Sequence, residues 1–86
     1  FTVLGAVQRP GTYQFSDRDP LNVLQAVGLA GGYTEFADPA KVTLKRLVSG
    51  KQSVFVLDAR RMARDSQARQ FNIQPGDMIT IREKIF

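Results

Sequence analysis

The chain has 86 residues, and 43% of them are hydrophobic, so it can form one small domain with a single core and is too apolar to be disordered. It contains neither cysteine nor histidine, which excludes disulfides, thiolate chemistry and imidazole ligands or bases. The net charge of +4 is mildly basic, and no apolar run approaches the ~18–20 residues that a membrane-spanning helix needs.

The first predicted elements form a hairpin. Residues 1–8 alternate in a strand pattern, and residues 12–16 alternate again. Residues 9–12 predict a type II turn, because Pro10 presets φ at the second position and Gly11 accepts a positive φ at the third. The chain starts inside the first strand pattern without a methionine, and we therefore expect it to be a piece of a longer protein.

A helix is predicted next, from Asp19 to the residue before Gly31. Asp19 can cap free amide donors, and Pro20 loses no hydrogen bond at the first helical position. The expected buried stripe recurs at threes and consists of Leu21, Leu24, Val27 and Ala30, broadened by Val23 and Ala26. Gly31 is expected to have a positive φ and to end the helix.

The double glycine at Gly31 and Gly32 could also suggest a phosphate loop. Phosphate loops place their glycines before a helix, where amide donors and the positive end of the helix dipole point outward. In this chain the glycines follow the predicted helix and lie at its carbonyl end. We therefore interpret them as helix termination.

The rest of the chain supplies more strands and another turn. Three further segments have strand patterns: residues 41–48, 52–57 and 78–82. Residues 59–67 predict a short polar helix, and Pro75 with Gly76 predicts a turn that starts the last strand. This order predicts one α+β domain over residues 1–86. We expect a β-grasp (ubiquitin-like) mixed sheet with one long helix packed on a face and with the first and last long strands as parallel neighbours.

The acidic side chains do not form a catalytic set. Asp77 follows the turn at Pro75 and Gly76, and its carboxylate is expected to bond turn amides. No two carboxylates have a spacing that singles out general acid–base chemistry, and no nucleophile–base pair, metal ligand set or cofactor loop is visible. We therefore expect a protein that is not an enzyme and that holds no metal or cofactor.

Basic residues cluster in and after the predicted second helix. The cluster consists of Arg60, Arg61, Arg64 and Arg69. These arginines could hold a phosphate, an anionic polysaccharide or an acidic partner, or they could form a solvated face. Nucleic acid is not expected, because its binding sites usually carry more charge and interleaved aromatic residues.

Tyr33 and Phe36 follow the helix end. One alternative packs these rings on the last helical turn, as the hydrophobic contact that accompanies a glycine cap. The other alternative leaves one ring exposed as a stacking platform for a sugar or a partner surface. The sequence leaves both alternatives open.

Three stretches together resemble one family. Residues 3–13, 21–36 (with Leu-Ala-Gly-Gly-Tyr-Thr-Glu-Phe) and 72–79 look like the opening, the central helix and the closing strand of an SLBB domain, a soluble-ligand-binding β-grasp domain. The residues that this resemblance carries over are structural: Pro10, Gly11, Gly31, Gly32, Pro75, Gly76 and Asp77. Two other β-grasp families do not fit, because a plant-type ferredoxin requires cysteines for its cluster and a ubiquitin-like carrier uses a C-terminal Gly-Gly.

The sequence is similar to the SLBB domains of outer-membrane polysaccharide export proteins in Gram-negative bacteria. That resemblance implies a non-enzymatic periplasmic module of an outer-membrane-associated protein. Such modules pack against other copies in a ring-shaped oligomer, through which capsule or exopolysaccharide leaves the cell. The alternative is a module that binds a sugar or another soluble molecule, with Tyr33, Phe36 and the arginine cluster as candidate contacts. Other SLBB relatives occur in respiratory-complex subunits and DNA-uptake proteins, so the domain type alone does not define the pathway.

Overall fold

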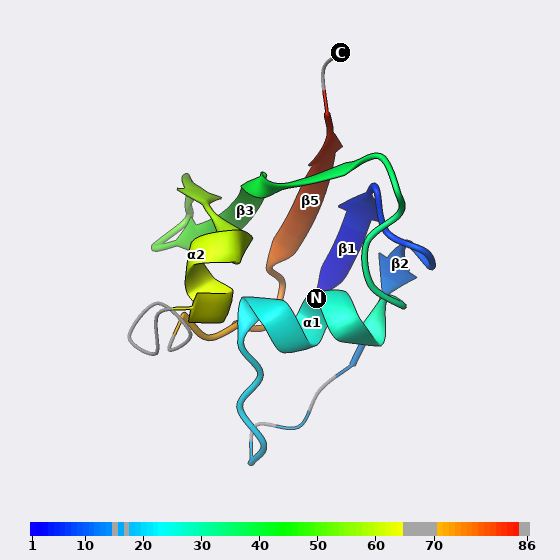
Figure 1. Ribbon diagram of the computed structural model, residues 1–86. Coiled ribbons are helices and arrows are strands. Elements are labelled where there is room, and N and C mark those ends of the chain that lie inside the picture. Colours follow the sequence, from blue (N-terminus) through cyan, green and yellow to red (C-terminus); the bar gives the residue numbers. More distant parts are fainter. Residues whose placement is uncertain (15, 17, 65–70, 85–86) are drawn as a thin grey trace.

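The computed structural model describes residues 1–14, 16, 18–64 and 71–84, which form a mixed α+β fold (Figure 1). The elements in chain order are β1 (Thr2–Gly5), β2 (Gly11–Thr12), α1 (Val23–Leu29), β3 (Ala37–Val48), β4 (Lys51–Leu57), α2 (Ala59–Arg64) and β5 (Met78–Glu83). The strands form one five-stranded sheet, and α1 and α2 lie on the same side of it.

The strand order in the sheet is β2-β1-β5-β3-β4. β1 and β5 are parallel, with Thr2 opposite Met78, and the other neighbouring strands are antiparallel. The predicted parallel pairing of the first and last long strands is therefore confirmed. Ser49 and Gly50 join β3 to β4 with φ angles of 52° and 79°, as in a type I′ turn, whose twist matches that of an antiparallel pair.

The first hairpin is shorter than the sequence predicts. β1 ends at Gly5, which has a φ of 86° and lies so close to β5 that an added Cβ would be 2.1 Å from the carbonyl oxygen of Ile81. The predicted type II turn is wrong. Gly11 lies opposite Val3 in the sheet, and its φ of 159° is far from the about +80° that the turn requires. Residue 15 of the predicted second strand lies outside the described residues.

The helix α1 also differs from the prediction, since it contains seven residues and is not a long helix. Its N-cap is Asn22, whose Oδ1 accepts the N–H of Gln25 at 2.8 Å while its own N–H donates to Gln25 Oε1 at 2.9 Å. Asp19 and Pro20 therefore do not start the helix. The intervening chain pairs instead with a distant segment: the Ile73 N–H donates to the Leu21 carbonyl at 2.7 Å.

The end of α1 follows the glycine prediction. Gly31 has the expected positive φ, at 85°, and Gly32 has a φ of 83°. The N–H of Gly31 donates to the Gly28 carbonyl, and the N–H of Gly32 donates to the Val27 carbonyl, both at 3.0 Å. This double pattern is a Schellman motif, which satisfies carbonyls that the last helical turn leaves unpaired.

The core lies between the sheet and the two helices. The most buried strand side chains face the helices: Val3, Val42, Leu44, Ile79 and Ile81. On α1 the buried residues are Val23, Ala26 and Val27, and the Ala30 side chain that follows them is also buried. Leu21 and Leu24, which the sequence places within the buried stripe, are only partly buried at the margin of the core. Helix α2 is present over Ala59–Arg64 and adds Met62 to the core; residues 65–67 of its predicted range lie outside the described residues.

Candidate functional site

We call the side of the sheet away from α1 and α2 the open face, because both described helices lie on the opposite side (Figure 1). Side chains alternate along a strand, so the open-face positions are those between the buried ones. They are Thr2, Leu4, Thr12, Lys41, Thr43, Lys45, Leu47, Gln52, Val54, Val56, Met78, Thr80 and Arg82. This set contains neither a carboxylate nor an aromatic ring, and its charged side chains are all cationic.

Large apolar side chains are exposed across the open face. They are Leu4, Leu47, Val54, Val56 and Met78. Leu47 and Val56 expose 75% and 73% of their surface. The register places Lys45 between Met78 and Val54, so apolar side chains and the stem of a lysine alternate across neighbouring strands. An apolar surface that continues over several strands is typical of a site for protein contact.

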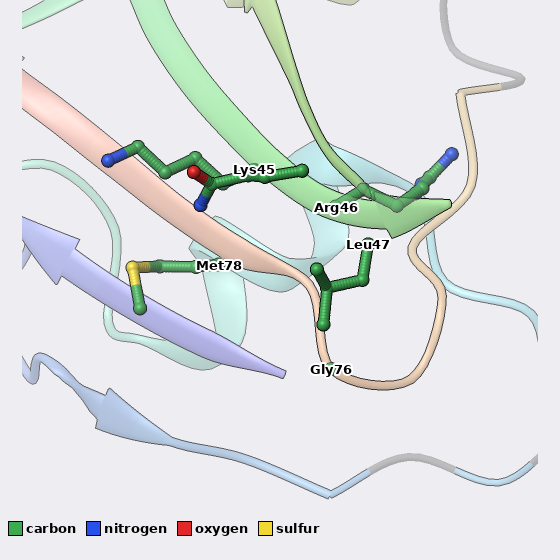
Figure 2. A pocket seen from close by; sticks show the side chains of 6 residues that line it. Lys45, Arg46, Leu47, Gly76 and Met78 are labelled. Atoms are coloured by element: carbon green, nitrogen blue, oxygen red, sulfur yellow. The ribbon is translucent and has the colours of Figure 1, made fainter. Parts of the chain in front are cut away.

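A small hollow lies at one end of the open face (Figure 2). Its lining residues are Lys45, Arg46, Leu47, Gln52, Gly76 and Met78, and its volume is 190 Å³. Figure 2 shows the Leu47 side chain extending toward Gly76, while Arg46 points the other way. Pockets that bind small molecules usually measure about 300–1,000 Å³, so this hollow is small for a ligand site and suits one side chain of a partner protein.

The Arg46–Asp77 ion pair holds the turn beside this hollow. Arg46 Nε donates to Asp77 Oδ1 at 3.0 Å, and Arg46 Nη2 donates to Asp77 Oδ2 at 2.8 Å and to the Asn72 carbonyl at 2.9 Å. Asp77 is 1% exposed and also accepts the N–H of Gln74 at 2.8 Å. The carboxylate therefore bonds a turn amide, as the sequence analysis expects, and in addition ties the turn to β3.

Aromatic rings complete the surroundings of Arg46. Its guanidinium carbon lies 5.6 Å from the ring centre of Phe55 and 5.3 Å from that of Phe71, and the two rings meet edge to face. Because these contacts and the bidentate pair with Asp77 occupy the guanidinium, Arg46 is a structural residue. The sequence analysis missed it. The available signal was its position in β3, two residues after buried Leu44, where an inward-facing charge requires a partner.

The structure brings the predicted glycine and proline motifs together around β1. The loop before β2 contacts the end of α1: the Gln8 N–H donates to the Gly32 carbonyl at 3.0 Å, and the Arg9 N–H donates to the Ala30 carbonyl at 2.8 Å. Pro10 and Gly11 continue this loop into β2. The turn that contains Pro75 and Gly76 lies at the other end of β1, where the Thr2 N–H donates to the Asp77 carbonyl at 2.9 Å.

Tyr33 and Phe36 adopt different environments. Tyr33 is partly buried against the core, and its carbonyl accepts a hydrogen bond from Gln8 Nε2 at 3.0 Å. Burial raises the pKa of the Tyr33 phenol, and the negative charge of Asp58 raises it further. Phe36 is 50% exposed. Each residue therefore matches one of the two alternatives, packing for Tyr33 and exposure for Phe36.

The arginine cluster lies on exposed α2. Arg60, Arg61 and Arg64 are exposed, and Arg69 lies outside the described residues. Asp58 caps the helix, since its Oδ1 accepts the N–H groups of Arg60 at 3.0 Å and of Arg61 at 3.3 Å. Desolvation acts to raise the pKa of Asp58, but the amide of Arg61 and the charge of Arg60 outweigh it and lower that pKa. The described arginines thus form a solvated basic surface on α2, whose N-terminus is capped by Asp58.

A second hollow, of 340 Å³, lies beside β2. Its lining includes Thr12, Tyr13 and Gln14 together with Pro75 and Gly76. The Tyr13 ring stacks on Phe1 and its hydroxyl donates to the Arg9 carbonyl, so the ring is already packed. This hollow is large enough for a small ligand, and none of the side chains that line it is charged.

Among the described residues, no group of His, Cys, Asp or Glu side chains is arranged to hold a metal ion, and no helix has the length and apolar character to cross a membrane. A comparison with known families matches residues 1–57 to the SLBB domain, and the chain belongs to that family of binding domains. A comparison with curated proteins gave no match. The family match covers β1 to β4, whereas the closing turn and β5 lie beyond it.

Proposed function

We propose that the chain is a periplasmic module of an outer-membrane-associated polysaccharide export protein, and that its open face packs against a neighbouring copy in a ring-shaped oligomer. On this proposal the domain is non-enzymatic and belongs to a longer protein that guides capsule or exopolysaccharide out of the cell. The proposal includes a β-grasp sheet, which is supported by the hairpin before the helix and by the parallel pairing of the first and last long strands.

The observation that carries the packing role is the exposed apolar surface of the open face. A sheet usually buries one face on its own core and exposes a polar one. In this domain Leu47, Val54 and Val56 remain exposed on the second face, and covering such side chains is worth roughly 25 cal/mol per Å² of apolar area. A protein surface is the expected cover, because no described residue of the open face has an aromatic ring on which a sugar could stack.

Binding of a soluble ligand is the second candidate, and the hollow beside Tyr13 is the observation that favours it. Its volume of 340 Å³ is at the lower end of the about 300–1,000 Å³ range of ligand pockets. Few polar groups converge there, and the packed ring of Tyr13 would limit stacking. The open face therefore supports the packing function better than either hollow supports ligand binding.

The test uses single cysteines, which are unique in this segment because it has none of its own. Leu47→Cys reports the open face, and Arg64→Cys on α2 is the matched exposed control. Both should react quickly with a bulky maleimide in the isolated 86-residue chain. In the assembled full-length protein, Leu47→Cys should become protected while Arg64→Cys stays reactive. Equal reactivity of Leu47→Cys in both states would overturn the proposal.

The isolated chain serves as the unassembled reference because we expect it to be largely monomeric. Stable interfaces typically bury roughly 1,200–2,000 Å² in total, and one small domain offers only part of that area. Stacked domains of a longer protein would add contacts along its length. Sedimentation of the isolated chain at micromolar concentration should therefore give a monomer, and a stable high-order oligomer would contradict this expectation.

A further inference from the structure

The outer edge of β4 carries main-chain donors and acceptors that the proposed packing does not use. β4 is the edge strand opposite β2 in the sheet. β2 contains only two residues, whereas β4 contains seven, without a proline and with an uninterrupted register to β3. Natural sheets usually protect their edges with short strands, prolines, bulges or inward charges. β2 is therefore protected by its short length, whereas β4 has neither a proline nor a bulge and is open to pairing with another strand.

The backbone groups that face outward from β4 can be assigned from the register. In a two-residue hairpin the residues that flank the turn, Val48 and Lys51, form a hydrogen-bonded pair, and every second residue of β4 then bonds to β3. The alternate residues Gln52, Val54 and Val56 direct their N–H and C=O groups away from the sheet. Within the described part of the chain, no backbone hydrogen bond from another element reaches these groups.

Charges around β4 indicate what kind of strand could pair there. Lys51 begins the strand, and Arg60 and Arg61 follow shortly after its end. The nearest carboxylate, Asp58, already accepts the amides of the first turn of α2. Two copies paired antiparallel at this edge would place Lys51 of each copy beside the basic start of α2 of the other, and these like charges would repel. An acidic partner strand would gain from the same charges.

We propose that β4 binds an extended segment of a partner protein as an added strand. The partner's main chain would pair with Gln52, Val54 and Val56. Its apolar side chains would lie beside Val54 and Val56, which are exposed by 55% and 73%, and its carboxylates would lie near Lys51 and the start of α2. Main-chain pairing supplies the affinity, and the alternating side chains supply the selectivity. This inference goes beyond the proposed function, since it concerns main-chain pairing at the edge of the sheet and not the packing of a neighbouring copy over its open face.

The probe is a synthetic peptide of alternating valine and threonine with a glutamate at each end, titrated into the isotope-labelled chain at low salt. Amide signals of Gln52, Val54 and Val56 should shift, and the shifts should weaken as salt is added. A peptide N-methylated at alternate residues keeps the side chains and loses the donors, so it should bind at least about tenfold more weakly. A version with lysine in place of glutamate should also bind more weakly.

The variant Val54→Pro tests the outer edge of β4 without disturbing the rest of the domain. The Val54 N–H faces outward, so proline removes a donor that the domain's own sheet does not use, and edge strands tolerate proline at such positions. The variant should keep the amide spectrum of a folded domain and lose about tenfold in peptide affinity. Val54→Thr, which keeps the donor, should bind like the parent chain.

Three results would overturn the proposal. The first is an absence of shifts at low salt. The second is a set of shifts centred on Leu4, Thr80 and Met78, which would place the peptide on the open face. The third is a set of β4 shifts that depend on protein concentration without peptide, which would make a second copy the occupant. None of these outcomes bears on the maleimide protection of Leu47→Cys, so failure of this inference and failure of the proposed function can be told apart.

Discussion

The two faces of the sheet carry similar alternating apolar patterns, yet the described helices cover only one of them. On β3, Leu44 is fully buried under the helices, while Leu47 exposes 75% of its surface on the open face. On β4, Phe55 packs against the core, while Val54 and Val56 are exposed. The strand sequences therefore specify the sheet but not what covers it. Burial of the first face comes from this chain, and we propose that burial of the second comes from a neighbour.

Two ion pairs among the described residues show the same contrast between interior and surface. Arg46 and Asp77 form a bidentate pair whose side chains are 13% and 1% exposed. Arg60 and Asp58 approach only to 3.5 Å, with side chains 61% and 38% exposed. The interior pair fixes the turn before β5, whereas the surface pair is screened by water and salt. Matched substitutions in these regions test this difference.

The largest effect is expected when the interior ion pair is broken. Asp77→Ala leaves the Arg46 guanidinium and the Gln74 amide without their partner, and such a loss typically costs about 3–5 kcal/mol. Asp58→Ala on the surface should cost much less, chiefly through the lost helix cap. Urea unfolding of both variants measures the difference. Similar small losses for the two would show that the Arg46–Asp77 pair contributes no more than a surface pair.

The two leucines of β3 provide the most direct comparison of the faces. Leu44→Ala should lower the free energy of unfolding by about 2–5 kcal/mol, because it opens a cavity in the core. Leu47→Ala should change it by less than about 0.5 kcal/mol in the isolated chain. Thermal or urea unfolding gives both values. A large loss for Leu47→Ala in the monomer would mean that this side chain already packs within the domain.

Two glycines near the end of α1 should respond in opposite directions to alanine. At Gly31, alanine would have to adopt a positive φ, and its Cβ would lie 2.9 Å from Gln8 Cβ, so we expect a loss of at least about 1 kcal/mol. At Gly28 no atom lies within 4 Å of the added Cβ, so alanine should stabilise the domain by about 0.5–1 kcal/mol. Midpoints that move in the same direction for both variants would contradict the assigned helix end.

The smallest expected effect concerns the ionisation of Tyr33. Burial, and then Asp58, raise its pKa above the ordinary value of 10.0. The folded state therefore keeps the phenol proton to higher pH than the unfolded state, so this contribution to stability is present below pH 10.0 and is lost as pH rises through the folded pKa. Asp58→Asn should lower the Tyr33 pKa toward its ordinary value. Carbon-13 NMR titration of the phenol measures it, and an unchanged pKa in Asp58→Asn would exclude the electrostatic contribution.

Local signals in the sequence predict much of the fold. The glycine cap at Gly31 depends on neighbouring residues, as do the turn at Ser49 and Gly50 and the alternation of β5. The start of α1 was predicted wrongly because two local caps compete. Asn22 caps the helix in place of Asp19, and the same segment pairs with residues near Asn72. That pairing joins segments far apart in sequence, and no local pattern reveals it.

The sequence predicts less of the candidate site, because the site also depends on contacts between residues that are far apart in the chain. Arg46 and Asp77 are 31 positions apart, and the hydrophobic alternation of β4 predicts burial equally well for both of its faces. The charge pattern of the sequence indicates the arginines of α2, and the structure places them on a solvated surface. The open face follows from the position of both described helices on one side of the sheet, which no local pattern in the sequence specifies.

The central claim is that a neighbouring protein surface covers the open face in the assembled export protein. Hydroxyl-radical footprinting of the intact oligomer, compared with the isolated chain, tests it without any substitution. The account predicts that Leu47 and Met78 react strongly in the isolated chain and are protected in the oligomer, while Arg60 on α2 keeps its reactivity. Equal reactivity of Leu47 and Met78 in the two states would contradict the claim.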